Sequence, residues 1–111
     1  MTAQVNSHHS QSELLAALAS PVRLAIIDLL TDEGELSVGT VATRRELTTA
    51  NASEHLMVLR QQGIVSARKA GTNVLCRIAN PLIPEALDLL NRMASADGNR
   101  SAASPIPREV P

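Results

Sequence analysis

The chain has 111 residues, 44% of them hydrophobic, and a formal net charge of −1, so it is long enough for one domain with a modest core but not for two. Phe, Tyr and Trp are absent, which leaves no aromatic platform for unpaired bases, and the lone Cys76 excludes an internal disulfide or a cysteine-rich zinc site. No apolar run approaches the roughly 20 residues of a membrane span and the start of the chain is polar, so the sequence predicts a cytoplasmic protein without a membrane partner.

The two ends of the chain differ in composition from its middle. Residues 1–9 are polar and predict a flexible N-terminal arm. Residues 98–111 are rich in Pro, Ser and Ala and predict a disordered tail. One folded domain is therefore expected over residues 10–97.

Two helices are expected at the start of this domain. Ser10 can cap the first helix, with Glu13 at the capping-box position. An apolar stripe at helical spacing follows: Leu14, Leu15 and Leu18. The stretch ASPVRLAIIDLL opens the second helix, with Ser20 as its cap and Pro21 at its first position, and Gly34 ends it.

A third and a fourth helix follow closely. The third lies within ELSVGTVATRREL and takes Ser37 as its cap. Thr48 or Thr49 starts the fourth, and Gly63 stops it at the C′ position. Apolar residues of the fourth repeat at spacings of four and three: Ala52, Leu56 and Leu59. Only a few residues separate the two helices, which predicts a helix-turn-helix.

A hairpin and a last helix complete the domain. IVSARKAGTNVLCRIA has a basic turn and places Val74, Cys76 and Ile78 at alternate positions. NPLIPEALDLLNRMA predicts a helix capped by Asn80 with Pro81 at its first position. The expected fold is mainly α with a small β-hairpin (α+β), in the order α-α-α-α-β-β-α.

The front of the fourth helix has side chains that suit a DNA groove. Its short polar residues let the backbone approach base edges, and the free N–H groups of a helix N-terminus face outward. The hairpin carries two cations at its tip and forms a wing that can touch phosphates or the minor groove. The predicted DNA-contacting residues are Thr48, Thr49, Asn51, Ser53, Glu54, His55, Arg60, Arg68, Lys69, Thr72 and Asn73.

The charge distribution agrees with this prediction without proving it. Residues 44–77 carry six basic and two acidic side chains, a local charge of +4 in a nearly neutral chain. Such a segment can present a local phosphate-binding face. On charge alone, a randomly uneven surface explains the pattern equally well.

Three stretches, LLAALASPVRLAIIDLL, NASEHLMVLRQQGIV and RKAGTNVLCRI, together resemble the winged helix-turn-helix repressors of the ArsR/SmtB family. The resemblance covers about residues 11–95 in the right order. It implies a winged helix-turn-helix, a homodimer formed by the first and last helices, and binding to pseudo-palindromic double-stranded operator DNA as a transcriptional repressor. The implied dimer-interface residues are Leu14, Leu15, Leu18, Leu82, Leu87 and Leu90. In a monomer the same leucines would be core.

Glu54 departs from the family pattern, in which a basic, His or Gln residue often stands. A carboxylate repels phosphate, but it can accept a hydrogen bond from cytosine N4. Glu54 therefore either reads a base or weakens DNA binding.

The family's metal sites are absent from this chain. Where the helix-three cysteine pair reads ELCVCDL, this sequence reads ELSVGTV, with Ser37 and Gly39 at the thiolate positions. The last-helix site of Asp, His and acid is replaced by Asn80, Leu82, Met93 and Ala96. A non-standard Ni²⁺ or Zn²⁺ site at His8, His9 and Glu13 is left as a hypothesis, against the alternative of solvated histidines.

Other polar residues have simpler explanations. His55 suits packing or the DNA side better than metal ligation, and Cys76 suits a buried apolar position better than a redox thiol. An acidic group is read as a solvated face, with a weak hard-cation site as the alternative. It comprises Asp28, Asp32, Glu33 and Glu35.

The sequence does not favour an enzyme. Ser53, Glu54 and His55 are consecutive on a helix, so they point about 100° apart and cannot form a catalytic relay. There is no glycine-rich phosphate loop and no H-E-x-x-H. The rival to the DNA-binding regulator is a protein-interaction winged helix, whose basic hairpin binds an acidic partner or RNA polymerase. For the regulator itself, the signal is left open between a metal ion, a co-regulator protein and no metal at all.

Overall fold

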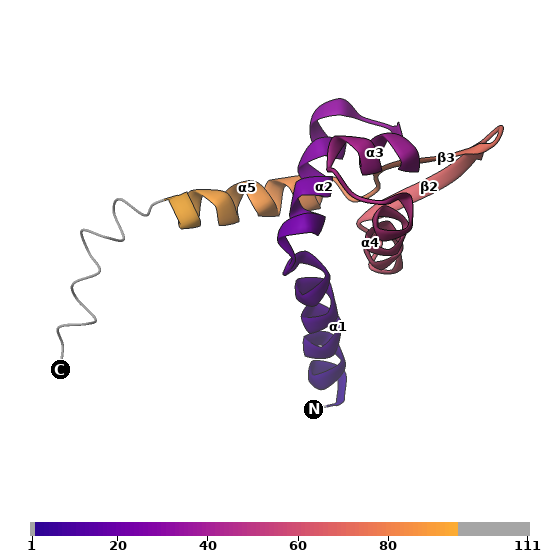
Figure 1. Ribbon diagram of the computed structural model, residues 1–111. Coiled ribbons are helices and arrows are strands. Elements are labelled where there is room, and N and C mark those ends of the chain that lie inside the picture. Colours follow the sequence, from indigo (N-terminus) through magenta and orange to yellow (C-terminus); the bar gives the residue numbers. More distant parts are fainter. Residues whose placement is uncertain (1, 96–111) are drawn as a thin grey trace. The chain divides into compact units, whose positions relative to one another are not determined.

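The computed structural model describes residues 2–95, with the side chains of residues 8–95. Five helices and three strands lie in this range (Figure 1). The chain divides into two compact units, and the boundary in the sequence lies between Pro81 and Leu82. Within the described part of the chain, no single helix is both long and apolar enough to span a bilayer.

Helix α1 (Thr2–Leu18) begins before Ser10, whereas a cap at Ser10 predicts Gln11 as the first helical residue. The predicted start was wrong because the residues before Ser10 include neither Gly nor Pro, so their backbone can continue the helix. His8 and His9 consequently lie on a helix and not on a loose arm. The predicted tail, residues 98–111, lies outside the described residues.

Helix α2 (Pro21–Glu33) has the ends that the sequence predicts. The Ser20 side chain accepts a hydrogen bond from the Arg23 backbone N–H at 3.2 Å, and Pro21 occupies the first turn. At the other end, Gly34 has a φ of +83° and its N–H donates to the Leu30 carbonyl at 2.9 Å.

The sheet has three strands, one more than the sequence predicts. Strand β1 (Leu36–Ser37) pairs antiparallel with β3 (Asn73–Ile78), which also pairs with β2 (Val65–Ala70), in the order β1-β3-β2. Two residues are too few to show alternation, so β1 was missed. The β2–β3 hairpin is confirmed, and its two-residue turn has Gly71 at a φ of +67°, as a type II′ turn requires.

Helix α3 (Val38–Arg44) begins at the predicted cap, where the Ser37 hydroxyl accepts from the Thr40 N–H at 3.1 Å. The chain then reverses through a Schellman-type turn. The Leu47 N–H donates to the Ala42 carbonyl at 2.8 Å, while Glu46 takes the left-handed conformation with a φ of +58°. This turn separates α3 from α4 and completes the helix-turn-helix.

Helix α4 (Thr49–Gln61) is closed at both ends by local hydrogen bonds. Thr48 is the N-cap, and its hydroxyl accepts from the Asn51 N–H at 3.0 Å. At the C-terminus, Gly63 has a φ of +71° and the Ile64 N–H donates to the Leu59 carbonyl at 3.0 Å. Leu59 and Ile64 are both fully buried, so the same turn fixes α4 against the core.

The core of the first unit is aliphatic, as the absence of aromatic residues requires. Among the described residues no polar or charged side chain is buried. The largest fully buried side chains come from α2, α3, α4, β3 and the turn after α4: Ile26, Ile27, Leu30, Val41, Leu59, Ile64 and Cys76.

Helix α5 (Leu82–Ser95) belongs to the second unit. It begins one residue after Pro81, so this proline precedes the first helical position and does not occupy it. Pro84 lies in the first turn, where no N–H donor is needed. Leu87 is half-buried. The exposed apolar residues of this helix are Leu82, Leu89, Leu90 and Met93.

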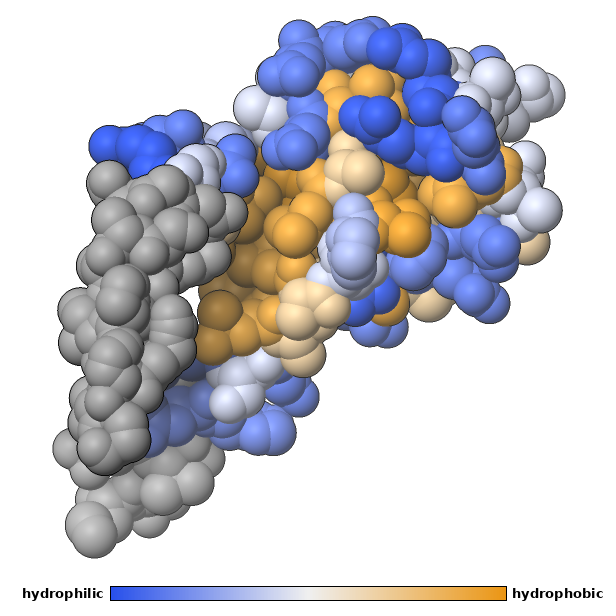
Figure 2. Space-filling view, turned by 60° about the vertical axis from the view of Figure 1, so that its left-hand side comes forward, coloured by the Kyte–Doolittle hydropathy of each residue, from blue (hydrophilic) through white to orange (hydrophobic). Residues whose placement is uncertain are grey.

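Exposure divides the leucines of α1. Leu15 is 60% exposed and Leu14 is half-buried. Leu18 is only 8% exposed and belongs to the core of its own unit. Apolar side chains also reach the surface on the face shown in Figure 2, where they are orange.

The turn at Glu46 generates a stability prediction. A left-handed conformation costs an L residue about 1 kcal/mol, most for a β-branched one, and glycine escapes this cost. Glu46→Gly should therefore leave the free energy of unfolding unchanged or raise it by up to about 1 kcal/mol, whereas Glu46→Val should lower it by about 1–2 kcal/mol. Urea denaturation measures both. A glycine variant less stable than the valine variant would show that the backbone conformation of residue 46 is not what limits this turn.

Candidate nucleic-acid interface

The front of α4, which is the outer face at its N-terminal end, is open to solvent, while the opposite face of the helix is buried. Thr48, Thr49, Asn51, Ser53 and Glu54 are all exposed. The buried residues of the helix are Ala52, Leu56 and Leu59. Backbone N–H groups of a first helical turn have no acceptor within the helix, so they face outward beside these side chains. The exposed set combines hydroxyl, amide and carboxylate groups, which can bind both phosphates and base edges.

The wing, residues 65–78, has two faces that follow from the register of its strands. Cys76 pairs with Ala67 and Val74 pairs with Lys69, and paired residues share a face. Ala67, Val74 and Cys76 line a cavity of about 240 Å³ together with residues of α4, so this face is turned towards α4. Lys69 therefore lies on the α4 side of the wing, and its neighbour Arg68 lies on the opposite side.

Arg68 is engaged within the chain. Its Nε and Nη2 donate to the two carboxylate oxygens of Glu35, each at 2.9 Å. This bidentate hydrogen bond holds the pKa of Glu35 below its usual value and raises the pKa of Arg68. Both wing cations are exposed, but Arg68 ties β2 to the residue before β1, whereas Lys69 forms no ion pair with a described residue.

The acidic group predicted from the sequence does not form one site. Glu33 accepts hydrogen bonds from Arg44, which lower the pKa of Glu33, and Glu35 is held by Arg68. Over residues 2–95, no three His, Cys, Asp or Glu side chains gather where they could share a metal ion. Two of the four acidic residues therefore form ion pairs with arginines of residues 44–77, the basic segment.

Three basic side chains in the described part of the basic segment are exposed and form no ion pair: Arg60, Lys69 and Arg77. Arg60 lies in the last turn of α4 and lines the cavity beside the wing. Arg77, on β3, is absent from the predicted contact set. The alternation that placed Cys76 inward could have placed Arg77 outward. Thr72 and Asn73, at the hairpin turn, are exposed, as a DNA contact would require.

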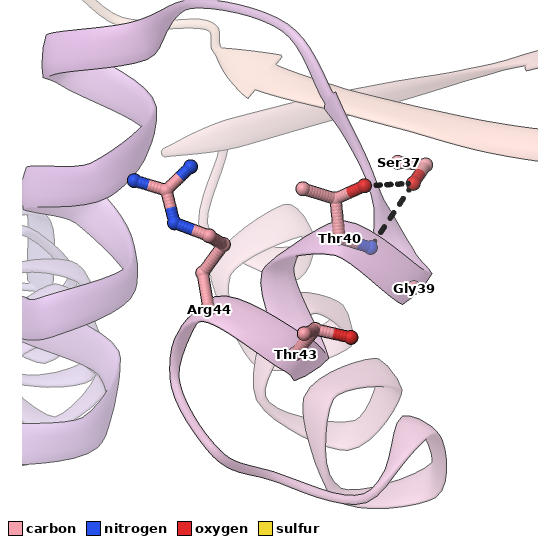
Figure 3. Close-up of a pocket in the computed structure, with 5 residues that line it drawn as sticks. All are labelled: Ser37, Gly39, Thr40, Thr43 and Arg44. Carbon is pink, nitrogen blue, oxygen red and sulfur yellow. Dashed lines mark hydrogen bonds between the residues drawn. The ribbon is translucent and has the colours of Figure 1, made fainter.

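An open hollow of about 450 Å³ lies over α3 (Figure 3). It is lined by Ser37, Gly39, Thr40, Thr43 and Arg44. The Ser37 hydroxyl is held by Thr40, to whose Oγ1 it donates at 2.9 Å. The positions matching the family's cysteine pair thus offer a hydroxyl and a glycine, and small polar residues here leave room for the sugar-phosphate backbone that the first helix of such a motif crosses.

The hypothetical metal ligands lie on α1. His9 Nε2 is 3.2 Å from Glu13 Oε2, one helical turn away. His8 precedes His9 directly, so its side chain leaves the helix about 100° away from this pair. The described side chains therefore supply two neighbouring ligands here and not three.

Two further residues are more buried than a contact residue would be. His55 is half-buried, and its Nδ1 lies 3.3 Å from Nη1 of Arg23 on α2. Cys76 is 1% exposed, which confirms its predicted burial, and desolvation raises the pKa of its thiol. A protonated, enclosed thiol is a poor nucleophile.

Comparison with known proteins supports the geometry. Residues 18–67 match a family model described as a helix-turn-helix domain. The chain is 38% identical over 80 residues to the transcriptional activator HlyU of Vibrio cholerae, covering 72% of this chain and 73% of that protein. It is 37% identical over 68 residues to the HTH-type transcriptional repressor SmtB of Mycobacterium tuberculosis, covering 61% and 50%.

A solved structure shows the same architecture. It is the homodimeric winged helix-turn-helix DNA-binding domain of a Mycobacterium bovis protein, described as a possible ArsR-family transcriptional regulator. The two chains superpose with a TM-score of 0.77 at 31% identity, covering 84% of this chain and 85% of that one. The similarity therefore extends well beyond α3 and α4.

The Glu35–Arg68 ion pair generates a pH prediction. Because the folded-state pKa of Glu35 lies below its unfolded value, the pair's stabilisation is present above the ordinary glutamate pKa and is lost as the pH falls through the lowered one. NMR titration should show a pKa of Glu35 below the usual glutamate value in the native protein. In Arg68→Gln the pKa of Glu35 should rise back to the usual range. A Glu35 pKa that is the same in both proteins would contradict the pairing.

Proposed function

The chain belongs to the ArsR/SmtB family of winged helix-turn-helix transcriptional regulators, and from this premise we propose that it is a sequence-specific repressor that binds double-stranded operator DNA as a homodimer. The observation that carries the proposal is the division of α4 into a buried rear and an exposed polar front. The front enters the major groove while the rear holds the helix on the core. In this proposal, the partner is double-stranded DNA and the protein binds it in the cytoplasm.

The homodimer follows from exposed apolar side chains on the two terminal helices. Leu15 on α1 and Leu90 on α5 are among the exposed large apolar residues. Burial of such side chains against a second copy is favourable. The similar Mycobacterium bovis domain is homodimeric. A two-fold dimer presents two copies of α4 at a spacing of about one helical turn of DNA, roughly 34–36 Å.

Repression needs nothing beyond tight binding across a promoter, because an occupied site excludes the polymerase. Activation needs an additional surface that recruits it. The similar proteins include one named an activator and one named a repressor. A reporter driven by the gene's own upstream region decides the matter: deletion of this protein should raise expression, and a fall would make it an activator.

A second candidate function is a protein-interaction module. It is favoured by the pairing of Arg44 and Arg68 with carboxylates, which leaves few cations for phosphate. Its basic hairpin would then bind an acidic protein or RNA polymerase. Gel-shift with the upstream region at physiological salt discriminates the two functions, since only the regulator forms a complex that survives excess unrelated duplex.

The Ni²⁺ or Zn²⁺ site at His8, His9 and Glu13 stays a prediction. The His9–Glu13 pair supplies two ligands, and a second copy of the chain can supply others. Calorimetry with each metal, on the native protein and on a His8→Ala/His9→Ala variant, tests whether these residues bind it.

The different situations of Lys69 and Arg68 predict different effects on DNA binding. Lys69→Ala should weaken binding and lower the dependence of log K on log salt by about one unit, because one phosphate contact is lost. Arg68→Ala should change this slope less, since the guanidinium is held by Glu35. Affinity measured at several salt concentrations gives both slopes. Equal losses of slope would show that Arg68 leaves Glu35 when DNA binds, and no loss for Lys69 would remove the wing from the interface.

The exposed front of α4 predicts a change of base preference. Asn51→Ala or Ser53→Ala should alter the sequences that the protein selects from a random duplex library. Loss of a bidentate contact from the Asn51 amide should cost about 1–3 kcal/mol of discrimination. A matched control is Gln61→Ala, an exposed residue at the far end of the same helix. Equal weakening on every sequence would contradict the assignment of α4 as the reader.

A further inference from the structure

One guanidinium in the first unit joins the end of α1 to α4. Arg23, on α2, donates from Nε to the Ala17 carbonyl at 2.6 Å and from Nη2 to the Ala16 carbonyl at 3.3 Å. Its Nη1 lies 3.3 Å from Nδ1 of His55 on α4. The residue is half-buried, so these contacts are only partly in competition with water.

The chemistry of each contact suits a structural link. The last carbonyls of a helix have no partner within it and carry partial negative charge, which favours a cation there. A guanidinium has donors and no acceptor, so Nδ1 of His55 must accept. This fixes the imidazole as the tautomer with its proton on Nε2. The axes of α1 and α2 differ in direction by 84°, and Arg23 bridges this bend through Nε and Nη2. Its third nitrogen, Nη1, contacts α4.

We propose that Arg23 is a positioning residue that couples α1 to the orientation of α4 and so sets which spacing of DNA half-sites the dimer accepts. This inference rests on the proposed function, in which α1 contacts the second copy and α4 contacts DNA. Leu15 directly precedes Ala16, whose carbonyl accepts from Arg23. The Leu15 side chain is exposed and therefore available to the second copy. Arg23 therefore gives a displacement at the dimer contact a direct side-chain route to α4.

The geometry of α4 makes it sensitive to such a link. Its large core contacts, Leu56 and Leu59, lie in its C-terminal half, while near Asn51 only the small side chain of Ala52 is buried. Leu59 and Asn51 are separated by about 12 Å at 1.5 Å per residue, so a tilt of about 10° moves Asn51 by roughly 2 Å. Hydrogen bonds to base edges tolerate much less. His55 lies between these positions, where a contact from α2 can hold the tilt.

A double-mutant cycle on a selected operator tests the coupling. Arg23→Lys keeps the charge but has no fork, and His55→Ala removes the acceptor. Each should weaken operator binding about tenfold, and the double variant should also lose about tenfold and not a hundredfold, because both remove the same link. His55→Asn, whose amide oxygen takes the position of Nδ1, should restore most of the affinity lost in His55→Ala. Additive losses would mean that His55 acts on DNA by itself and would overturn the proposal.

The matched control is Arg45→Lys. Arg45 is also half-buried and donates from Nε to a carbonyl of α2, that of Ala25, at 3.1 Å, so its side-chain hydrogen bond runs to α2 and not to α4. With operators whose half-sites are moved one base pair apart or together, Arg23→Lys should lose the preference of the native protein for one spacing, and Arg45→Lys should keep it. Thermal unfolding of the two variants shows whether either change is a general loss of stability. Equal spacing preference in both variants would contradict the proposal.

A measurement without DNA separates this inference from the proposed function. In NMR spectra, Arg23→Lys should shift the backbone amides of α4 around His55 and change the tautomer signature of its ring, whereas Arg45→Lys should not. Unmoved α4 signals would overturn the coupling whether or not the protein binds DNA. Failure of the native protein to select any sequence would instead overturn the proposed function and the role in half-site spacing, while the structural link from Arg23 to α4 would stand.

Discussion

The structure depends on holding α4 from one side only. Ala52, Leu56 and Leu59 bury one stripe of this helix in an aliphatic core, and the Schellman turn at Gly63 returns Ile64 to the same core. Within the described part of the chain, nothing comparable covers the front of the helix, where the residues are short and polar. The left-handed turn at Glu46 sets where that front begins. A helix anchored in this way can enter a groove without losing its attachment to the domain.

The arginines of this chain serve the fold as much as they serve a ligand. Arg44 and Arg68 pair with Glu33 and Glu35, and Arg23 holds the carboxyl end of α1. Exposed ion pairs contribute little stability individually. Their effect here is geometric, because they fix α3 to α2 and the wing to the residue before β1. The charge of the basic segment therefore overstates the number of cations that are free to meet phosphate, and affinity must come from few of them together with the backbone N–H groups of α4.

Local chemistry made most of the fold predictable. Caps at Ser20, Ser37 and Thr48 and the glycine at position 63 obey rules that involve a few adjacent residues, so the sequence locates these helix ends to within a residue. The front of α4 was predictable for the same reason, since helical periodicity separates its buried from its exposed side. The start of α1 was not, because no residue before Ser10 marks a boundary.

The parts that could not be predicted are contacts between distant positions. Arg68 and Glu35 are 33 residues apart, and Arg23 and His55 are 32 residues apart, so no local pattern indicates either pair. Strand β1 exists only because β3 offers it an edge. These long-range contacts decide which of the predicted cations form ion pairs and which way His55 faces. The residues that make up the site therefore could not be predicted from the sequence alone.

The most direct measurement of the central claim is an NMR titration of the native protein with a selected operator duplex. The account predicts that the largest amide and side-chain shifts fall on Thr49–Glu54 and on Lys69, with the buried residues of α4 little changed. Shifts confined to α5, with those positions unmoved, would contradict it.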